Sequence, residues 1–143
     1  MKPKLSKSLV ALREAIDDSF PSRSRVSDGT LGDSKHQKRG SKSDHNPDAQ
    51  GWVRAFDCTA RLDDNPETMS DLVNQLRQVA KRDGRLSYII YQGKICSPIL
   101  NWKWRNYKGA SPHNHHAHFS FKKSADMDTR SFHIIPMLGA NNE

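Results

Sequence analysis

The sequence lacks the features that mark disulfide-rich and membrane-spanning proteins. Its two cysteines, Cys58 and Cys96, are too few for a disulfide framework, so we expect them to be small buried side chains. No apolar run reaches the roughly eighteen residues that a transmembrane helix needs. The apolar core of a secretory signal is also missing, because the start of the chain is interrupted by charges: Arg13, Glu14, Asp17 and Asp18. We therefore expect cytoplasmic synthesis without a signal peptide, and no stable insertion into a membrane.

Acidic residues are absent from positions 101–123, which carry only basic charges: Lys103, Arg105, Lys108, Lys122 and Lys123. The whole chain has a net charge of +7 and a pI of about 9.6. Such an excess favours a polyanionic partner, whether nucleic acid, anionic lipid or bacterial cell wall. Charge alone does not choose among them. However, no recognition helix or nucleic-acid motif is visible, and no acidic cluster suits magnesium.

Apolar residues are also scarce between positions 21 and 51, where Ser, Gly, Asp, Lys and Pro dominate. A structureless stretch of about thirty residues is uncommon in a compact domain, and such loops are either functional or disordered. Around it, apolar spacing predicts helices over residues 5–20 and from a cap at Asp64-Asn65-Pro66 to Gly84.

Strands are expected at residues 52–58 and 116–121, with a hairpin around Gln92-Gly93 over residues 86–97. These elements predict one α+β domain, in which a small antiparallel sheet packs against two or three helices and carries the functional site. We place the core at about residues 5–121 of the single domain 1–143. Residues 122–143 would form a weakly structured C-terminal extension.

Four of the seven histidines lie within residues 113–118. If residues 116–121 form a strand, His116, His118 and Ser120 share one face. The opposite face then carries the apolar residues of the segment: Ala117, Phe119 and Phe121. Two imidazoles on one face of an anchored strand form a rigid place for a metal ion or for acid–base chemistry. The alternative is a polar edge strand that happens to be rich in histidine.

Two upstream residues can complete a metal site with this strand. His45 lies in a polar loop with a turn signal, and Asp57 ends an apolar strand. A carboxylate there is costly to bury unless a positive group pairs with it. Taken alone, His45 suggests a surface histidine, and Asp57 suggests a partner for Arg54 or a loop cap. Together with His118 they make a His/Asp/His set, whose ligand types suit zinc.

Several short motifs follow one another over roughly residues 26–121: Asp28-Gly29-Thr30-x-Gly32-Asp33, Ser43-Asp44-His45-Asn46-Pro47, Gly51-x-Val53-x-Ala55-x-Asp57, Tyr88-Ile89-Ile90-Tyr91, Trp104-Arg105-x-Tyr107-x-Gly109, Pro112-His113 and His116-x-His118. This order resembles the zinc peptidases of the lysostaphin, D-alanyl-D-alanine peptidase and hedgehog group. It resembles the peptidase domains of bacteriophage endolysins more closely. The resemblance implies that His45, Asp57 and His118 hold one Zn²⁺.

The resemblance also implies a catalytic histidine at His116. His113 matches a further active-site histidine of the penicillin-insensitive murein endopeptidases of the group. Many relatives place an acidic general base three residues before the last ligand, where this chain has His115, so the base here would be His116 or His113. A second departure is the spacing of twelve between His45 and Asp57, which is longer than is common in the group and matches the endolysin branch.

Further residues are candidates for contact with substrate. The longer loop leaves the role of Ser43 open, and Trp104, Arg105 and Tyr107 could line a substrate groove, together with Trp102. Core aromatic residues beside a solvated basic face are an equal alternative for this segment.

The implied function is hydrolysis of an amide bond in the murein stem or cross-link peptide, of the L-alanyl-D-glutamate or D-alanyl-diaminopimelate type. The protein would be a monomeric phage endolysin whose partner is bacterial peptidoglycan rather than nucleic acid. Made in the host cytoplasm, it would reach the periplasm or cell wall through a separate pore.

Two other classes of function remain open. One is a zinc-containing domain that binds cell walls without catalysis, and the other is a basic nucleic-acid-binding domain or nuclease.

Overall fold

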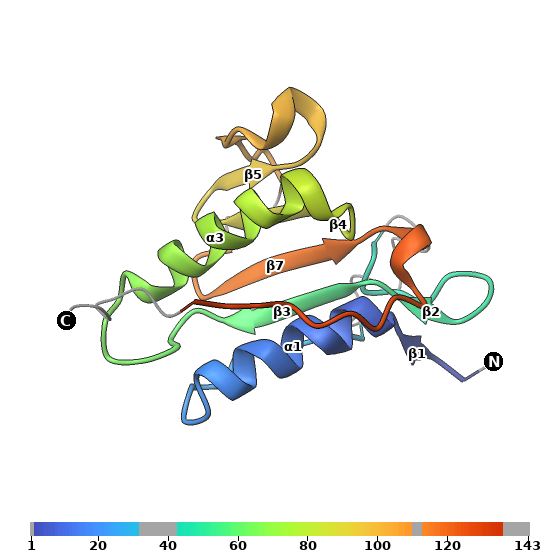
Figure 1. The fold of residues 1–143 in the computed structure, drawn as a ribbon, viewed down its shortest axis with the longest axis horizontal. Coiled ribbons are helices and arrows are strands. Elements are labelled where there is room, and N and C mark those ends of the chain that lie inside the picture. Colours follow the sequence, from blue (N-terminus) through green and yellow to red (C-terminus); the bar gives the residue numbers. More distant parts are fainter. Residues whose placement is uncertain (1, 32–42, 110–112, 136–143) are drawn as a thin grey trace.

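The structure, a computed structural model, describes residues 2–31, 43–109 and 113–135. Its main element is an antiparallel sheet of five strands in the order β3-β7-β4-β5-β6 (Figure 1). The strands are β3 (Ala55–Thr59), β4 (Leu86–Tyr91), β5 (Lys94–Cys96), β6 (Arg105–Asn106) and β7 (His116–Phe121). A short parallel pair, β1 (Lys4–Leu5) and β2 (Trp52–Val53), lies beside them. With two α-helices on this sheet, the predicted α+β class is confirmed.

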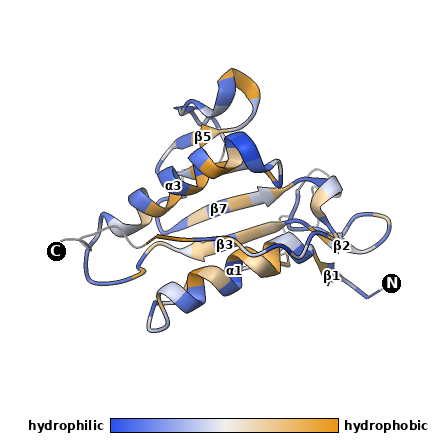
Figure 2. Ribbon diagram, in the orientation of Figure 1, coloured by the Kyte–Doolittle hydropathy of each residue, from blue (hydrophilic) through white to orange (hydrophobic). Residues whose placement is uncertain are grey.

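Both helices bury one side against the same face of the sheet. Helix α1 spans Lys7–Ser19 and helix α3 spans Thr68–Asp83, and each is striped with hydrophobic and hydrophilic residues (Figure 2). Gly84 ends α3 in the left-handed conformation, with φ 81°. The predicted start of α3 at Pro66 is wrong, because Pro66 and Glu67 form a turn first. The carbonyl of Asn65 closes that turn by accepting the Thr68 N–H at 3.2 Å.

The predicted hairpin is formed by β4 and β5. Gln92 and Gly93 connect these strands with φ values of 49° and 74°, and two positive values in a two-residue turn match the right-handed twist of the strands. The predicted strand over residues 52–58 is interrupted at Arg54, because Val53 pairs with β1 whereas Ala55 onward pairs with β7.

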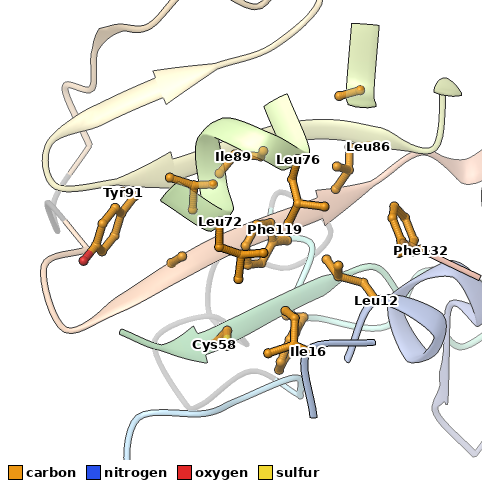
Figure 3. Packing of buried hydrophobic residues seen from close by; sticks show 14 of the residues in the cluster. Leu12, Ile16, Cys58, Leu72, Leu76, Leu86, Ile89, Tyr91, Phe119 and Phe132 are labelled. Carbon is orange, nitrogen blue, oxygen red and sulfur yellow. The ribbon is translucent and has the colours of Figure 1, made fainter. Parts of the chain in front are cut away.

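The register of the sheet separates its two faces. Cross-strand partners lie on the same face, and Phe119 of β7 pairs with Phe56 of β3 and Ile89 of β4. Around Phe119 lie Leu12 and Ile16 of α1 and Leu72 and Leu76 of α3 (Figure 3). The alternate residues of β7, His116 and His118, therefore point away from this core.

The segment after β7 also contributes to the core. It begins with a short 3-10 helix, Lys123–Ala125. Phe132 is 5% exposed and lies edge-on to Phe121, with ring centroids 6.5 Å apart. The guanidinium of Arg85 lies over the Phe132 ring, 3.7 Å from its centroid. Packing in the described part of the chain thus continues beyond residue 121, where we had expected an extension.

Replacing Phe119 with alanine should lower the free energy of unfolding by about 3–5 kcal/mol, because the ring is completely buried and its loss leaves a cavity. Urea denaturation followed by circular dichroism measures this change. The exposed His115 is a matched control, and His115→Ala should stay within about 0.5 kcal/mol of the unsubstituted protein. A loss below about 1 kcal/mol for Phe119→Ala would contradict the central position of this ring.

Candidate metal centre

The face of the sheet opposite the helices brings His45, Asp57 and His118 together. One ligand atom from each lies within 4.8 Å of the others. Asp57 Oδ2 is 3.1 Å from His45 Nε2, and Asp57 Oδ1 is 3.0 Å from His118 Nδ1. Ligand atoms about 2.0–2.1 Å from a tetrahedral zinc ion are themselves about 3.3 Å apart. The three residues that the sequence nominated therefore form a group positioned to hold a metal ion.

Strand register places Asp57 directly opposite His118. The backbone N–H and C=O of Asp57 both bond to Gly29, at 2.8 and 3.0 Å, and so they point away from β7. Asp57 and His118 are thus a non-hydrogen-bonded cross-strand pair, the kind in which side chains approach most closely. The carboxylate and the imidazole meet because of this pairing.

A buried ion pair fixes the segment that lies along Asp57. Arg23, whose side chain is 1% exposed, donates to both carboxylate oxygens of Asp28 at 2.9 and 2.7 Å. Asp28 also accepts the backbone N–H and the hydroxyl of Thr59, at 2.8 and 2.7 Å. These bonds hold Gly29 against Asp57 and place the carbonyl of Thr30 beside the metal group. The described parts of the loop over residues 21–51 are therefore built around the site.

A turn carries His45 into this position. The Asp48 carboxylate accepts the backbone N–H groups of Gln50 and Trp52, each at 2.9 Å, and so closes the turn that follows His45. Arg54 then bonds to Asp48 at 2.6 Å and to Asp126 at 2.7 Å. The alternative in which Asp57 pairs with Arg54 is wrong, because Arg54 joins the loop to the C-terminal segment instead.

Each candidate ligand histidine is oriented by a partner on its other ring nitrogen. His45 Nδ1 donates to the Thr30 carbonyl at 2.7 Å, which leaves Nε2 facing Asp57. His118 Nε2 lies 2.8 Å from the Ser120 hydroxyl, which leaves Nδ1 facing Asp57. Such partners fix the tautomer and the ring orientation of metal-bound histidines. Ser120 was expected on the same face of the strand as His118, whereas Thr30 acts through its backbone and could not be identified by residue type.

Tyr88 supports the site in a way that the sequence analysis missed. Its ring stacks on His118 with centroids 5.3 Å apart and an interplanar angle of 8°. Its hydroxyl donates to the Asp44 carboxylate at 3.3 Å, which links β4 to the His45 loop. Tyr88 lies opposite Ser120 and hence on the same face of the sheet as His118. The alternation of side chains along β4 was the sequence signal that could have placed it there.

The pKa values of Asp57, His45 and His116 are shifted in different directions. Burial opposes ionisation of Asp57, but hydrogen bonds from His118 and His45 outweigh it and hold the carboxyl pKa well below its usual range. Burial likewise opposes protonation of His45, yet the hydrogen bond and the charge of Asp57 raise its pKa. For His116 burial prevails over the nearby carboxylate and lowers the pKa. His116 is therefore neutral at neutral pH and can accept a proton.

Metal affinity should fall as the pH is lowered through the raised pKa of His45, because a proton on that imidazole competes with the ion. Asp57 remains ionised over this range, since its pKa is lowered, and so adds no pH dependence of its own. We expect a fall of about tenfold per pH unit for each proton displaced. Competition with a chromophoric chelator between pH 8 and pH 5.5 measures it, and an affinity constant that did not change with pH would contradict the ligand role of His45.

His113 and His116 lie next to this group. The His116 ring nitrogen Nε2 is 3.6 Å from Asp57 Oδ2. The His113 ring is 5.0 Å from that of His116 and 5.5 Å from that of His118, measured between centroids. Tyr107 contacts His113 edge-on at 5.6 Å, which brings one predicted substrate contact to the site.

The other predicted substrate contacts divide between the two faces. Arg105 pairs with Ile95, which pairs with Ile90 opposite His118, so Arg105 lies on the histidine face of the sheet. The prediction that Trp104 lines the same groove is wrong, because its indole N–H donates to Asn74 of α3 at 2.8 Å on the helical side. Trp102 is 4% exposed in the core. The Ser43 hydroxyl accepts the His45 N–H at 3.3 Å and so supports the loop backbone.

The remaining candidates have simpler placements. His115 and His133 are exposed. Cys58 and Cys96 are buried free thiols, and burial raises the pKa of each to about 12, which confirms their role as small core side chains. His36, Gly32, Asp33 and Pro112 lie outside the described residues. Within the described ranges, every helix is too short or too polar to cross a membrane.

Scans against protein-family models and searches of curated proteins and solved structures gave no match to this chain. Its function is accordingly inferred from the chemistry of the site.

Proposed function

We propose that the protein is a zinc-dependent peptidase of the bacterial cell wall, a phage endolysin that hydrolyses an amide bond in the murein stem or cross-link peptide. One observation carries the proposal. Two imidazoles and a carboxylate converge from a loop and two strands, and the third imidazole, His116, lies 3.6 Å from the same carboxylate. A metal-binding group with an adjacent neutral base is the arrangement of metal-assisted hydrolysis.

Zinc fits the donor atoms of this group. Two histidine nitrogens and one carboxylate oxygen are common ligands of catalytic zinc, which keeps a fourth position open. When bound, zinc polarises a carbonyl and lowers the pKa of water from about 15.7 to about 7. The partners on the far ring nitrogens, the Thr30 carbonyl and the Ser120 hydroxyl, keep the ligand nitrogens turned inward whether or not the ion is present.

The neighbouring histidines supply the proton transfers. His116 accepts a proton from the attacking water and passes it to the leaving amine, because burial lowers its pKa and keeps it neutral. His113, edge-on to His116, and Tyr107 beyond it hold the peptide next to this base. Cleavage of glycan would need two carboxyl groups on either side of the sugar bond, whereas the carboxylate here is engaged by two histidines.

Basic charge beside the site supports an anionic substrate. Lys94, Arg105 and Lys108 lie on or next to the β5–β6 edge of the sheet, in a segment without acidic residues. A stem peptide carries several carboxylates, so this edge is suited to bind it, and activity should fall as salt screens the attraction. We infer cleavage beside a D-configured residue, at L-alanyl-D-glutamate or D-alanyl-diaminopimelate. The enzyme would act as a monomer on peptidoglycan, which it reaches from the host cytoplasm through a separate pore.

Incubation with purified peptidoglycan, and separately with DNA, tests this function when each is done with and without a chelator. Mass spectrometry should find muropeptides with a new amino-terminal D-glutamate or diaminopimelate, and the residue exposed identifies the bond. Chelator-sensitive cleavage of DNA would favour a nuclease instead. Binding to peptidoglycan without any product would favour a cell-wall-binding domain that lacks catalysis.

A further inference from the structure

A second group of side chains that could hold a metal ion lies beside the first. Ligand atoms of Asp57, His113 and His116 come within 4.8 Å of one another, and Asp57 belongs to both groups. The two groups differ in exposure. His45 and His118 are 4% and 5% exposed, whereas all three members of the second group are partly accessible to solvent. An ion could thus enter the second group while the first is filled.

The geometry of the second group suits a shared carboxylate. Asp57 Oδ1 faces His118 at 3.0 Å, and Oδ2 faces His45 at 3.1 Å and His116 at 3.6 Å. The rings of His113 and His116 stand edge-on at 89° with centroids 5.0 Å apart. Neighbouring ions in two-metal sites are about 3.5–4 Å apart, a separation that the two oxygens of one carboxylate can bridge.

We propose that Asp57, His113 and His116 form a second, weaker site for Zn²⁺, and that its occupation inhibits the enzyme. Binding is weaker because one carboxylate then serves two divalent cations, which repel each other. Inhibition follows because the ion takes up the imidazole lone pair of His116, and His116 can no longer accept a proton. This inhibitory part rests on the proposed peptidase function, whereas the binding of a second ion does not.

Zinc titration of the metal-free protein, residues 1–143, tests the binding. Equilibrium dialysis with elemental analysis should give two equivalents of Zn²⁺ per chain, taken up in two phases. His113→Ala and His116→Ala should each lose the second equivalent and keep the first. The matched control is His115→Ala, which removes an exposed histidine between them and should keep both equivalents. Circular dichroism verifies that each variant is folded.

Peptidoglycan hydrolysis measured along the same titration tests the inhibition. The rate should rise up to one equivalent and fall as the second fills, whereas His113→Ala should retain its own one-equivalent rate in excess zinc. Saturation of the unsubstituted protein at one equivalent would overturn the proposal, as would two equivalents in both His113→Ala and His116→Ala. If the protein binds two zinc ions but hydrolyses no peptidoglycan at any zinc load, the proposed peptidase function is wrong, whereas the proposed second metal site is supported.

Discussion

His45→Ala is expected to lose its bound zinc and, with it, all measurable amide hydrolysis. The substitution removes one of three proposed ligands. Loss of a residue that only hydrogen-bonds to a ligand weakens metal affinity by about 10–100-fold, so loss of a ligand itself should weaken it more. Elemental analysis after dialysis against a zinc buffer should find about a tenth of an equivalent of zinc per chain or less. Bound metal stabilises only the folded state, so the melting temperature in zinc should fall as well.

His133→Ala is the control for this experiment, because His133 is an exposed histidine of the C-terminal segment. It should retain both zinc and activity. Full zinc occupancy in His45→Ala would show that the ligand set is wrong. Asp57→Asn provides a second variant of similar shape, and it should also lose the metal because the amide is a weaker ligand than the ionised carboxylate.

His116→Ala should reduce the rate of hydrolysis by about 10²–10⁴-fold while one equivalent of zinc stays bound. The reason is that His116 lies beside Asp57 but outside the proposed set of three ligands, and burial lowers its pKa, as the proposed role of base requires. Steady-state kinetics on a soluble muropeptide, with zinc measured on the same samples, separates the two effects. The loss should fall on kcat more than on KM, because proton transfer acts in the transition state.

Loss of the first zinc equivalent in His116→Ala would make His116 a ligand and remove it as the base. His113→Ala is the comparison, since we propose that this residue only orients the peptide, and its loss should cost less activity. Equal losses in the two variants would mean that the histidines act as one unit, and a double substitution would then cost little more than either alone.

Local patterns were sufficient to predict the elements that carry the site. Alternation along residues 116–121 placed His116 and His118 opposite the buried Phe119, because the period of a strand is two residues and the core needs one apolar face. The turn at Gln92-Gly93 was likewise readable from residue type. His45 and Asp57 each suggested an ordinary role when taken alone. Only their combination with His118, together with the family resemblance, pointed to them as candidate ligands.

Features that depend on pairing across the chain could not be read in this way. The bonds from Gly29 to Asp57 and from Thr30 to His45 involve backbone groups, which residue type does not reveal. Trp104 and Arg105 are neighbours in sequence, yet only the register of β6 shows that they point to opposite faces. Asp126 was assigned to a loose extension, whereas its carboxylate holds Arg54.

Release of new amino groups from purified peptidoglycan tests the central claim most directly. The zinc-loaded protein should release amino groups and no reducing sugars, lose this activity with a chelator, and regain it when zinc is restored. The metal-free protein should bind peptidoglycan without cutting it. Release of reducing sugars without new amino groups, or activity that a chelator leaves unchanged, would contradict a metal-dependent peptidase.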